Sequence, residues 1–348
     1  MEPHEKDSAE RRLNELGYKQ ELHRSMSMAK ALGIAFSTVT LFTGIIPLYG
    51  FSLSFEGPPP LVWGWLIVSF FTWFVALALA EICSSFPTAG SLYFWTAHLA
   101  GPRWGPFASW CCAWLELLGT IASIGAQVHI FCIDWKKERD FALTMLVLTW
   151  QAYAGSQVLQ NIVLLSTGTH KGGGYFAPPW VCLCIYICMA VIWGFLNTFT
   201  LELVAYIGIV SIWWQVIGGM LFVLYLPFVA SRKQSASFVF LNFVELSNIS
   251  RVPSKGYGVI MSLLISQYSL FGYDAAAHLT EETKDADLNG PIAILYSLAM
   301  VSLLGWAIIL VLTFCIQDPF SLYDLNNETG GSFVPAQILY DIFYGKIP

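Results

Sequence analysis

Long apolar stretches separated by short polar segments dominate this sequence of 348 residues. A helix needs about 20 mostly apolar residues to cross a bilayer, and eight stretches reach that length. They are 31–55, 61–83, 106–133, 141–167, 179–200, 202–230, 257–279 and 291–316. The sequence therefore predicts an all-α polytopic protein, embedded in the lipid bilayer of the plasma membrane or an endomembrane.

The charged residues are few and clustered, which excludes several classes of protein. Only 11% of the residues are charged, against about a quarter in a soluble domain. Many of them lie in 1–30, 134–140 and 281–287. The net charge of −6 also lacks the basic footprint of a protein that binds nucleic acid. A soluble enzyme, a disordered chain and a nucleic-acid-binding protein are excluded on these grounds.

The first 30 residues are predicted to form a cytoplasmic segment. They carry six basic residues ahead of the first apolar stretch, and such residues are retained on the cytoplasmic side of a membrane. A cleavable signal peptide is not expected, because the first apolar stretch is long enough to insert as an anchor.

No cofactor, metal ion or catalytic group is predicted. The eight cysteines all fall in or beside apolar stretches, where a buried thiol is the usual state. Paired carboxylates, metal-ligand spacings and nucleophile–base pairs do not occur within a stretch, so an enzyme is not expected.

The first apolar stretch has polar groups at its centre. Ser37, Thr38, Thr40 and Gly44 lie there, and Pro47 follows them. Such a helix can open in mid-membrane and present backbone N–H and C=O groups to a cavity. The alternative is that the hydroxyls bond to carbonyls of their own helix and the glycines allow close packing.

A second polar cluster lies in the latter part of the stretch 257–279. Its members are Tyr268, Ser269, Gly272, Tyr273, Asp274 and His278, and the apolar Phe271 lies among them. Asp274 and His278 are four residues apart, so they share a helix face and are able to pair. Ionisable groups within a membrane usually line a functional cavity, although a solvated helix end is the alternative. Two interrupted spans in one chain are typical of the central site of a transporter.

Two short loops carry charges suited to a gate. Glu81 ends the second apolar stretch and Arg103 lies in the loop that follows, while Glu281 and Glu282 come soon after His278. A contact between Arg103 and one of these carboxylates would close an inner gate. The alternative is a surface ion pair, which contributes little to stability.

Four motifs point to a known family. They are Glu81–Gly90 (EICSSFPTAG), Trp104–Phe107 (WGPF), Phe271–Glu282 (FGYDAAAHLTEE) and Asn289–Ile292 (NGPI). These motifs resemble the amino acid–polyamine–organocation superfamily, and within it the GABA permease and bidirectional amino acid transporter branch of plants and fungi. The resemblance covers residues from about 25 to 127 and from 152 to 345.

The resemblance implies a fold and a binding site. Members of the superfamily have about twelve helices, of which the first ten form two inverted five-helix repeats with broken first and sixth helices. The first repeat would cover 31–230, the start of the second would cover 257–316, and 317–348 would form an extramembrane loop. The substrate would lie at the breaks, Ser37–Gly44 and Ser269–Gly272, with Tyr273 beside it, and the backbone there would bind its carboxylate and its amine.

The sequence departs from the family pattern in two places. Residues 128–151 interrupt the third helix and include six charges between Asp134 and Asp140. The insertion begins with Val128, whose codons start with GT, and ends with Gln151, whose codon CAG ends in AG. These are the border sequences of an intron, so we hypothesise that the insertion is a translated intron. The sequence also stops at Pro348, where the family pattern expects an eighth helix to follow.

The insertion leaves two topologies open. If 141–167 crosses the membrane by itself, the chain has eight crossings instead of seven and every later loop changes side. Candidate glycosylation sequons at Asn248 and Asn327 favour the family topology. Four basic residues favour the flipped one: Arg232, Lys233, Arg251 and Lys255. We expect the family arrangement, with the insertion bulging from the third helix.

The leading functional hypothesis is transport of amino acids by alternating access. GABA, alanine, glutamate and basic amino acids are the candidate substrates. Coupling would involve protons, with Asp274, His278 or Glu81 as carriers, or it would be exchange. The second hypothesis, motivated by the insertion and the early end, is a non-transporting isoform that associates with a full-length transporter.

Overall fold

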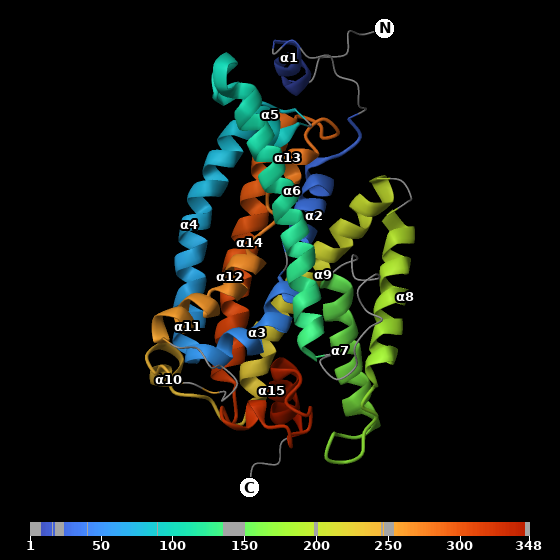
Figure 1. Cartoon of the computed structure of the whole chain (residues 1–348), viewed down its shortest axis with the longest axis vertical. Helices are drawn as coiled ribbons and strands as arrows, with labels where there is room; N and C mark the ends of the chain where they lie inside the picture. The colour runs from blue at the N-terminus through green and yellow to red at the C-terminus, as the bar shows by residue number, and fades with distance from the viewer. Residues whose placement is uncertain are drawn as a thin grey trace.

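The computed structural model describes residues 8–15, 17, 24–39, 41–88, 90–134, 150–197, 201–244, 246 and 254–344. Within these residues the regular elements are α-helices and one 3-10 turn (Figure 1). Their bounds are α1 Ser8–Glu15, α2 Met28–Thr38, α3 Phe42–Glu56, α4 Pro58–Ser85, α5 Ser91–Leu99, α6 Gly101–Asp134, α7 Trp150–Thr167, α8 Pro179–Asn197, α9 Leu201–Val229, α10 Ala236–Phe240, α11 Lys255–Ser262, α12 Leu264–Ser269, α13 Ala275–His278, α14 Ala286–Phe314, η1 Ser321–Tyr323 and α15 Val334–Phe343. The all-α prediction is confirmed for this part of the chain.

Four helical segments of the described chain are long and apolar enough to cross a membrane. They are Met28–Glu56, which comprises α2 and α3, Pro58–Ser85, Ala205–Val229 and Ala286–Phe314. Each of these lies within a few residues of a span expected from the sequence. Many of their large apolar side chains are exposed, including Phe71 and Phe74 on α4, as expected for helices that face lipid.

The long helix α14 forms the centre of the molecule. It lies against α4, α2 and α9, and its side chains Leu298, Val301 and Ile308 are fully buried. The indole Nε1 of Trp65 on α4 donates a hydrogen bond to the carbonyl oxygen of Ser302 at 2.9 Å. This bond satisfies the polar atom of a fully buried tryptophan, so α4 is fixed to α14 at mid-helix.

Two glycines bring α2 and α9 into backbone contact. A Cβ on Gly33 would lie 3.0 Å from the backbone nitrogen of Ile209, and a Cβ on Gly208 would lie 2.9 Å from the carbonyl carbon of Gly33. Small residues allow such close approach between membrane helices. Close packing, the alternative role predicted for glycines of the first apolar stretch, is thus observed where α2 crosses α9.

Contacts between distant segments define the two ends of the molecule. The segment 24–27, predicted to be cytoplasmic, pairs through Met26 with Glu282 and Lys284, and we call this the inner end. At the opposite, outer end the hydroxyl of Tyr323 donates to the carbonyl oxygen of Gly50 at 2.6 Å. In Figure 1, α5 and α13 lie at the inner end and α10 and α15 at the outer end.

These contacts bear on the topology, because each joins a residue before the insertion to one after it. In the flipped arrangement with eight crossings, 24–27 and 282–284 would lie on opposite sides of the membrane. Their hydrogen bonds therefore favour the family arrangement with seven crossings. Helix α6 continues through residues 128–134 of the insertion, and 135–149 lie outside the described residues.

Candidate functional site

The first membrane helix is interrupted where the sequence predicted it. Helix α2 ends at Thr38 and α3 begins at Phe42, and Val39, the residue after α2, has an extended backbone. The N-cap residue of α3, Leu41, makes no side-chain hydrogen bond to the start of that helix. Free N–H groups at a helix start attract negatively charged groups. Pro47 lies inside α3 rather than at the break.

The hydroxyls beside this break also bond within their own helix. Ser37 Oγ donates to Ile34 O at 2.9 Å, and Thr38 Oγ1 lies 2.7 Å from Ala35 O. The hydroxyls thus form the hydrogen bonds within their own helix that the alternative interpretation expects, and the helix is interrupted nevertheless. Gly44 is buried in the first turn of α3, and Thr40 lies outside the described residues.

The second interruption separates α12 from the short helix α13. Helix α12 ends at Ser269 and α13 begins at Ala275. Between them Gly272 has φ +93°, a backbone conformation that favours glycine. The side chain of Phe271 is 65% exposed and that of Tyr273 is half-buried. Ser269 is buried, and its hydroxyl oxygen has no hydrogen-bond partner in the described structure.

The two interruptions touch each other. Thr38 Oγ1 is 2.9 Å from the carbonyl oxygen of Gly272. A Cβ on Gly272 would lie 2.9 Å from the carbonyl oxygen of Thr38, so the backbones approach as closely as a glycine allows. The open end of α2, the start of α3 and the loop 270–274 are thereby gathered in one place, although they come from opposite ends of the chain.

A cluster of ionisable side chains lies next to the second interruption. His278 Nε2 is 3.8 Å from Asp274 Oδ2, which confirms the predicted pairing, and 3.8 Å from Glu116 Oε1 of α6. Glu116 was not expected at this site from the sequence. Its signal was a lone carboxylate within the apolar stretch 106–133, and such groups are costly in a membrane unless they serve a function.

The predicted gate between Arg103 and the loop carboxylates is not formed in this structure. Arg103 is exposed and makes no ion pair with a described residue. The carbonyl oxygen of Glu282 instead accepts a hydrogen bond from Met26 N at 2.9 Å. Glu81 lies at the inner end of α4, where its carbonyl oxygen accepts a hydrogen bond from Ser85 Oγ at 3.1 Å.

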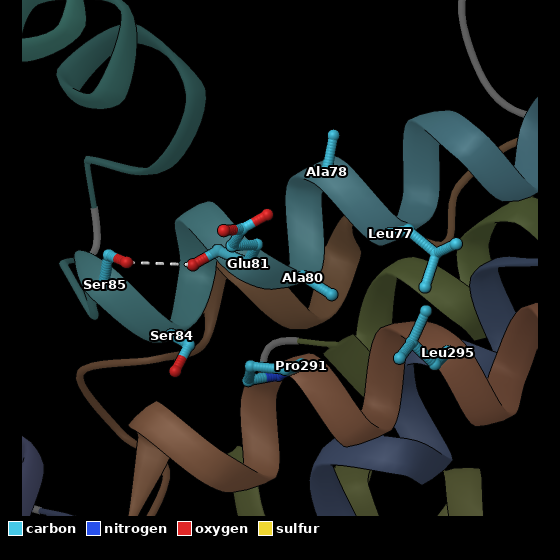
Figure 2. A pocket seen from close by; sticks show the side chains of 8 residues that line it. All are labelled: Leu77, Ala78, Ala80, Glu81, Ser84, Ser85, Pro291 and Leu295. Atoms are coloured by element: carbon cyan, nitrogen blue, oxygen red, sulfur yellow. Dashed lines mark hydrogen bonds between the residues drawn. The ribbon is translucent and has the colours of Figure 1, made fainter.

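Glu81 borders a hollow of about 620 Å³ between α4 and α14. Figure 2 shows Leu77 of α4 and Leu295 of α14 pointing towards one another across it, with Pro291 on the same wall as Leu295. Glu81, Ser84 and Ser85 line the polar part of the hollow. The two helix interruptions do not line it, so the hollow and the paired interruptions are separate features.

Comparison with known proteins decides the family. The family model described as amino acid permease matches residues 26–347. The chain belongs to this family. Family membership and the apolar helices together identify an integral, multi-pass membrane protein.

Several relatives carry permease names. The amino-acid permease BAT1 of Arabidopsis thaliana is 39% identical over 340 residues, which are 98% of this chain and 61% of that protein. Its homologue from Oryza sativa subsp. japonica is 38% identical over 340 residues, 98% of this chain and 60% of the relative. The GABA-specific permease of Saccharomyces cerevisiae is 30% identical over 335 residues, 94% of this chain and 52% of the relative. The chain thus spans only part of the length of these permeases.

The structure at the outer end bears on one of the predicted glycosylation sites. Asn327, a candidate for glycosylation, is 4% exposed. Its Nδ2 donates to the carbonyl oxygens of Ser321 and Leu322, and its Oδ1 accepts from the backbone of Thr329 and Gly331. A glycan on Nδ2 would replace one of its two hydrogens and remove one of these donated bonds, and the buried side chain leaves no room for the sugar. Asn248, the other candidate, lies outside the described residues.

A polar network joins the loop after α14 to the loop before α8. Lys171 Nζ pairs with Glu328 Oε1 at 3.1 Å, and Gln337 Nε2 donates to Glu328 Oε2 at 2.9 Å and to Asp341 Oδ1 at 2.7 Å. Burial raises the pKa of Asp341 to about 6, despite the hydrogen bond from Gln337. Burial also acts to raise the pKa of Glu328, but hydrogen bonds from Gln337 and Lys171 outweigh it, and this pKa is lowered.

Proposed function

We propose that this chain transports small amino acids across a membrane by alternating access, with the substrate held between the two helix interruptions. GABA, alanine, glutamate and basic amino acids are the candidate substrates. Membership of the amino acid permease family supports the class of reaction, and one relative bears the name GABA-specific permease.

The contact between Thr38 and Gly272 carries this proposal. Each interruption alone leaves only a few backbone groups open, because a helix end has four orphan N–H or C=O groups. The 2.9 Å approach of Thr38 Oγ1 to Gly272 O places the ends of both broken helices together. Donors from the start of α3 and acceptors from the end of α2 and the loop 270–274 are then available to one small molecule.

A zwitterion suits this arrangement. Its carboxylate needs hydrogen-bond donors and its ammonium needs acceptors, and the backbone at the two breaks offers both. The first apolar stretch, 31–55, carries no charged side chain, so a buried, unpaired charge does not have to be maintained in the absence of substrate. The exposed ring of Phe271 is positioned in the loop 270–274 to cover the apolar part of the ligand.

The cluster of Asp274, His278 and Glu116 is our candidate for coupling. A histidine between two carboxylates, each at 3.8 Å, can change its charge near neutral pH. Its place directly after the second interruption would link protonation to the conformation of α13. Exchange of one amino acid for another remains the competing mode, and imposed proton gradients distinguish the two.

Uptake by the purified chain in liposomes tests the proposal. Labelled GABA, alanine, glutamate and arginine are offered to the full chain, to a chain lacking 128–151 and to protein-free liposomes. Gly272→Ala is expected to lower uptake at least tenfold, because its Cβ would meet Thr38 O. Gly173→Ala is the matched control: Gly173 also has positive φ, +71°, but a Cβ there would meet nothing within 4 Å.

The outcomes separate the two functional hypotheses. Saturable uptake that Gly272→Ala abolishes and Gly173→Ala preserves supports transport through the paired interruptions. Equal uptake by Gly272→Ala and Gly173→Ala would contradict the placement of the substrate between the two interruptions. Folded protein without uptake that co-purifies with a full-length permease would support the non-transporting partner instead.

A further inference from the structure

An isolated β-bridge joins the segment before α2 to the segment after α13. Met26 N donates to Glu282 O at 2.9 Å, and Lys284 N donates to Met26 O at 2.9 Å. Met26 thus lies opposite Thr283 in a parallel pair. We call this pairing of 24–27 with 282–284 the inner β-bridge.

The inner β-bridge is buried, although it lies at an end of the molecule. Met26 and Thr283 are each 1% exposed, and Arg24 is 8% exposed. The guanidinium Nη1 of Arg24 approaches the carbonyl oxygen of Thr283 at 3.5 Å. Buried backbone hydrogen bonds are costly to leave unmade, so the two segments are expected to separate rarely.

The position of the bridge gives it a mechanical role. Residue 27 is the N-cap of α2, so segment 24–27 leads directly into that helix. On the other side, Thr283 Oγ1 donates to Leu279 O at 2.8 Å, which ties the segment to the residue after α13. At the opposite ends of α2 and α13, Thr38 contacts Gly272. The two inner half-helices are therefore attached to each other at both ends.

We propose that Met26 is a positioning residue, whose backbone pairing makes α2 and α13 move as one body when the inner side of the site opens. The proposal rests on the proposed transport function, since it describes the movement that transport requires. The joint movement would be relative to α9, whose backbone α2 approaches closely at Gly33 and Gly208. A movement in which α2 swings away from α13 by itself is thereby excluded.

A cysteine cross-link tests whether the bridged segments ever part. In a cysteine-depleted chain, Met26→Cys and Thr283→Cys are introduced together and oxidised, since residues opposite each other in a bridge are close enough for a disulfide. Uptake is expected to stay within twofold of that of the reduced protein, because a bond between segments that move together restrains nothing. Uptake that oxidation abolishes and a reductant restores would overturn the proposal.

A proline substitution tests whether the hydrogen bonds of the bridge hold the two segments together. Met26→Pro removes the N–H that bonds to Glu282 O, whereas Ser27→Pro is a matched control at a residue with φ −81°, which proline accepts. Spin labels at Ala29 and Lys284 report the distance between the two segments, and labels at Ala29 and Trp214 report the distance between α2 and α9.

The expected result is a narrow Ala29–Lys284 distance in the parent and in Ser27→Pro. Met26→Pro should reduce the ratio of bridged to unbridged molecules roughly fivefold, the effect of one lost hydrogen bond. An Ala29–Lys284 distribution in Met26→Pro identical to that in Ser27→Pro would overturn the proposal. If Met26→Pro does not fold, Lys284→Pro removes the second bond from the partner segment, and the label is then placed at Glu281 instead of Lys284.

The spin-label distances do not depend on uptake. Loss of uptake in every sample, with the Ala29–Lys284 distance narrow, would therefore count against the transport function while upholding the bridge. Uptake together with a broad Ala29–Lys284 distance in the parent chain would support the transport function and count against the bridge.

Discussion

The hydroxyl of Thr38 lies between a carbonyl oxygen of its own helix, α2, and a carbonyl oxygen of the loop 270–274. Ala35 O is 2.7 Å away in its own helix, and Gly272 O is 2.9 Å away across the site. A hydroxyl has one hydrogen to donate, so it bonds to one of these oxygens at a time or shares the hydrogen between them. Thr38 can therefore release the second broken helix without leaving its own donor unsatisfied.

Removing this hydroxyl should weaken substrate binding without unfolding the chain. Thr38→Val keeps the shape of the side chain and loses a bond of about 1 kcal/mol, so the half-saturating substrate concentration should rise about fivefold. Thr38→Ser, which retains the hydroxyl, should restore most of the affinity. Concentration dependence of uptake is the measurement, and a Thr38→Val variant with parental affinity would contradict the role of the contact.

The crossing of α2 and α9 should tolerate no added methyl group. Gly208→Ala would place a Cβ 2.9 Å from the carbonyl carbon of Gly33, and overpacking of this kind costs about 1–3 kcal/mol. Gly218→Ala on the same helix meets nothing within 4 Å, and should be neutral or stabilising because alanine favours helix. Thermal unfolding of both variants in detergent gives the comparison, and equal melting temperatures would refute the close approach.

The burial of Asn327 predicts an unglycosylated but structurally important side chain. In a eukaryotic host, Asn327→Gln should leave electrophoretic mobility unchanged, before and after glycosidase treatment. It should also speed proteolysis of the loop 318–333, since each buried donor or acceptor left unpaired costs about 1–3 kcal/mol. Asn326→Gln, at an exposed neighbour, is the control. A glycosidase-sensitive shift that Asn327→Gln removes would show that the loop carries a glycan.

The outer network should be most stable in mildly acidic solution. Because burial raises the pKa of Asp341 to about 6, the folded chain holds that proton more tightly than the unfolded chain does. Its contribution to stability is complete below pH about 4 and is lost as the pH rises through 6. Glu328 has the opposite sign: its pKa is lowered, so its contribution is present above pH about 4.3 and is lost in stronger acid.

Hydrogen exchange of α15 against pH tests this assignment. Protection should be greatest near pH 5 and should fall towards pH 7.5. Asp341→Asn keeps an acceptor for Gln337 and removes the titration, so it should flatten the profile between pH 4.5 and 7.5. An unchanged profile in this variant would place the titrating group elsewhere.

The sequence predicted those parts of the site that depend on one segment at a time. Hydroxyls and glycines in an apolar stretch marked the break after Thr38, and a four-residue spacing marked the pair Asp274–His278. Both signals are local, since they follow from the geometry of one helix.

The parts that were missed depend on contacts between distant segments. Glu116 approaches His278 only because α6 lies beside α13, and no spacing within one helix reports that. Asn327 has the sequence of an exposed sequon, yet the turn 321–331 folds around its amide and buries it. Arg103 and the carboxylates offered a plausible ion pair by charge alone, while the backbone of Glu282 is held by Met26 instead.

The inner β-bridge has a consequence for how the chain is made. Arg24 and its partner Thr283 are 259 positions apart, so the segment that precedes the first membrane helix must wait for its partner to be synthesised. At about 5–20 residues per second this delay is roughly 13–50 seconds. During that time the buried edge of 24–27 is unpaired on the nascent chain, and a chaperone or the ribosome surface has a defined interval in which to shield it.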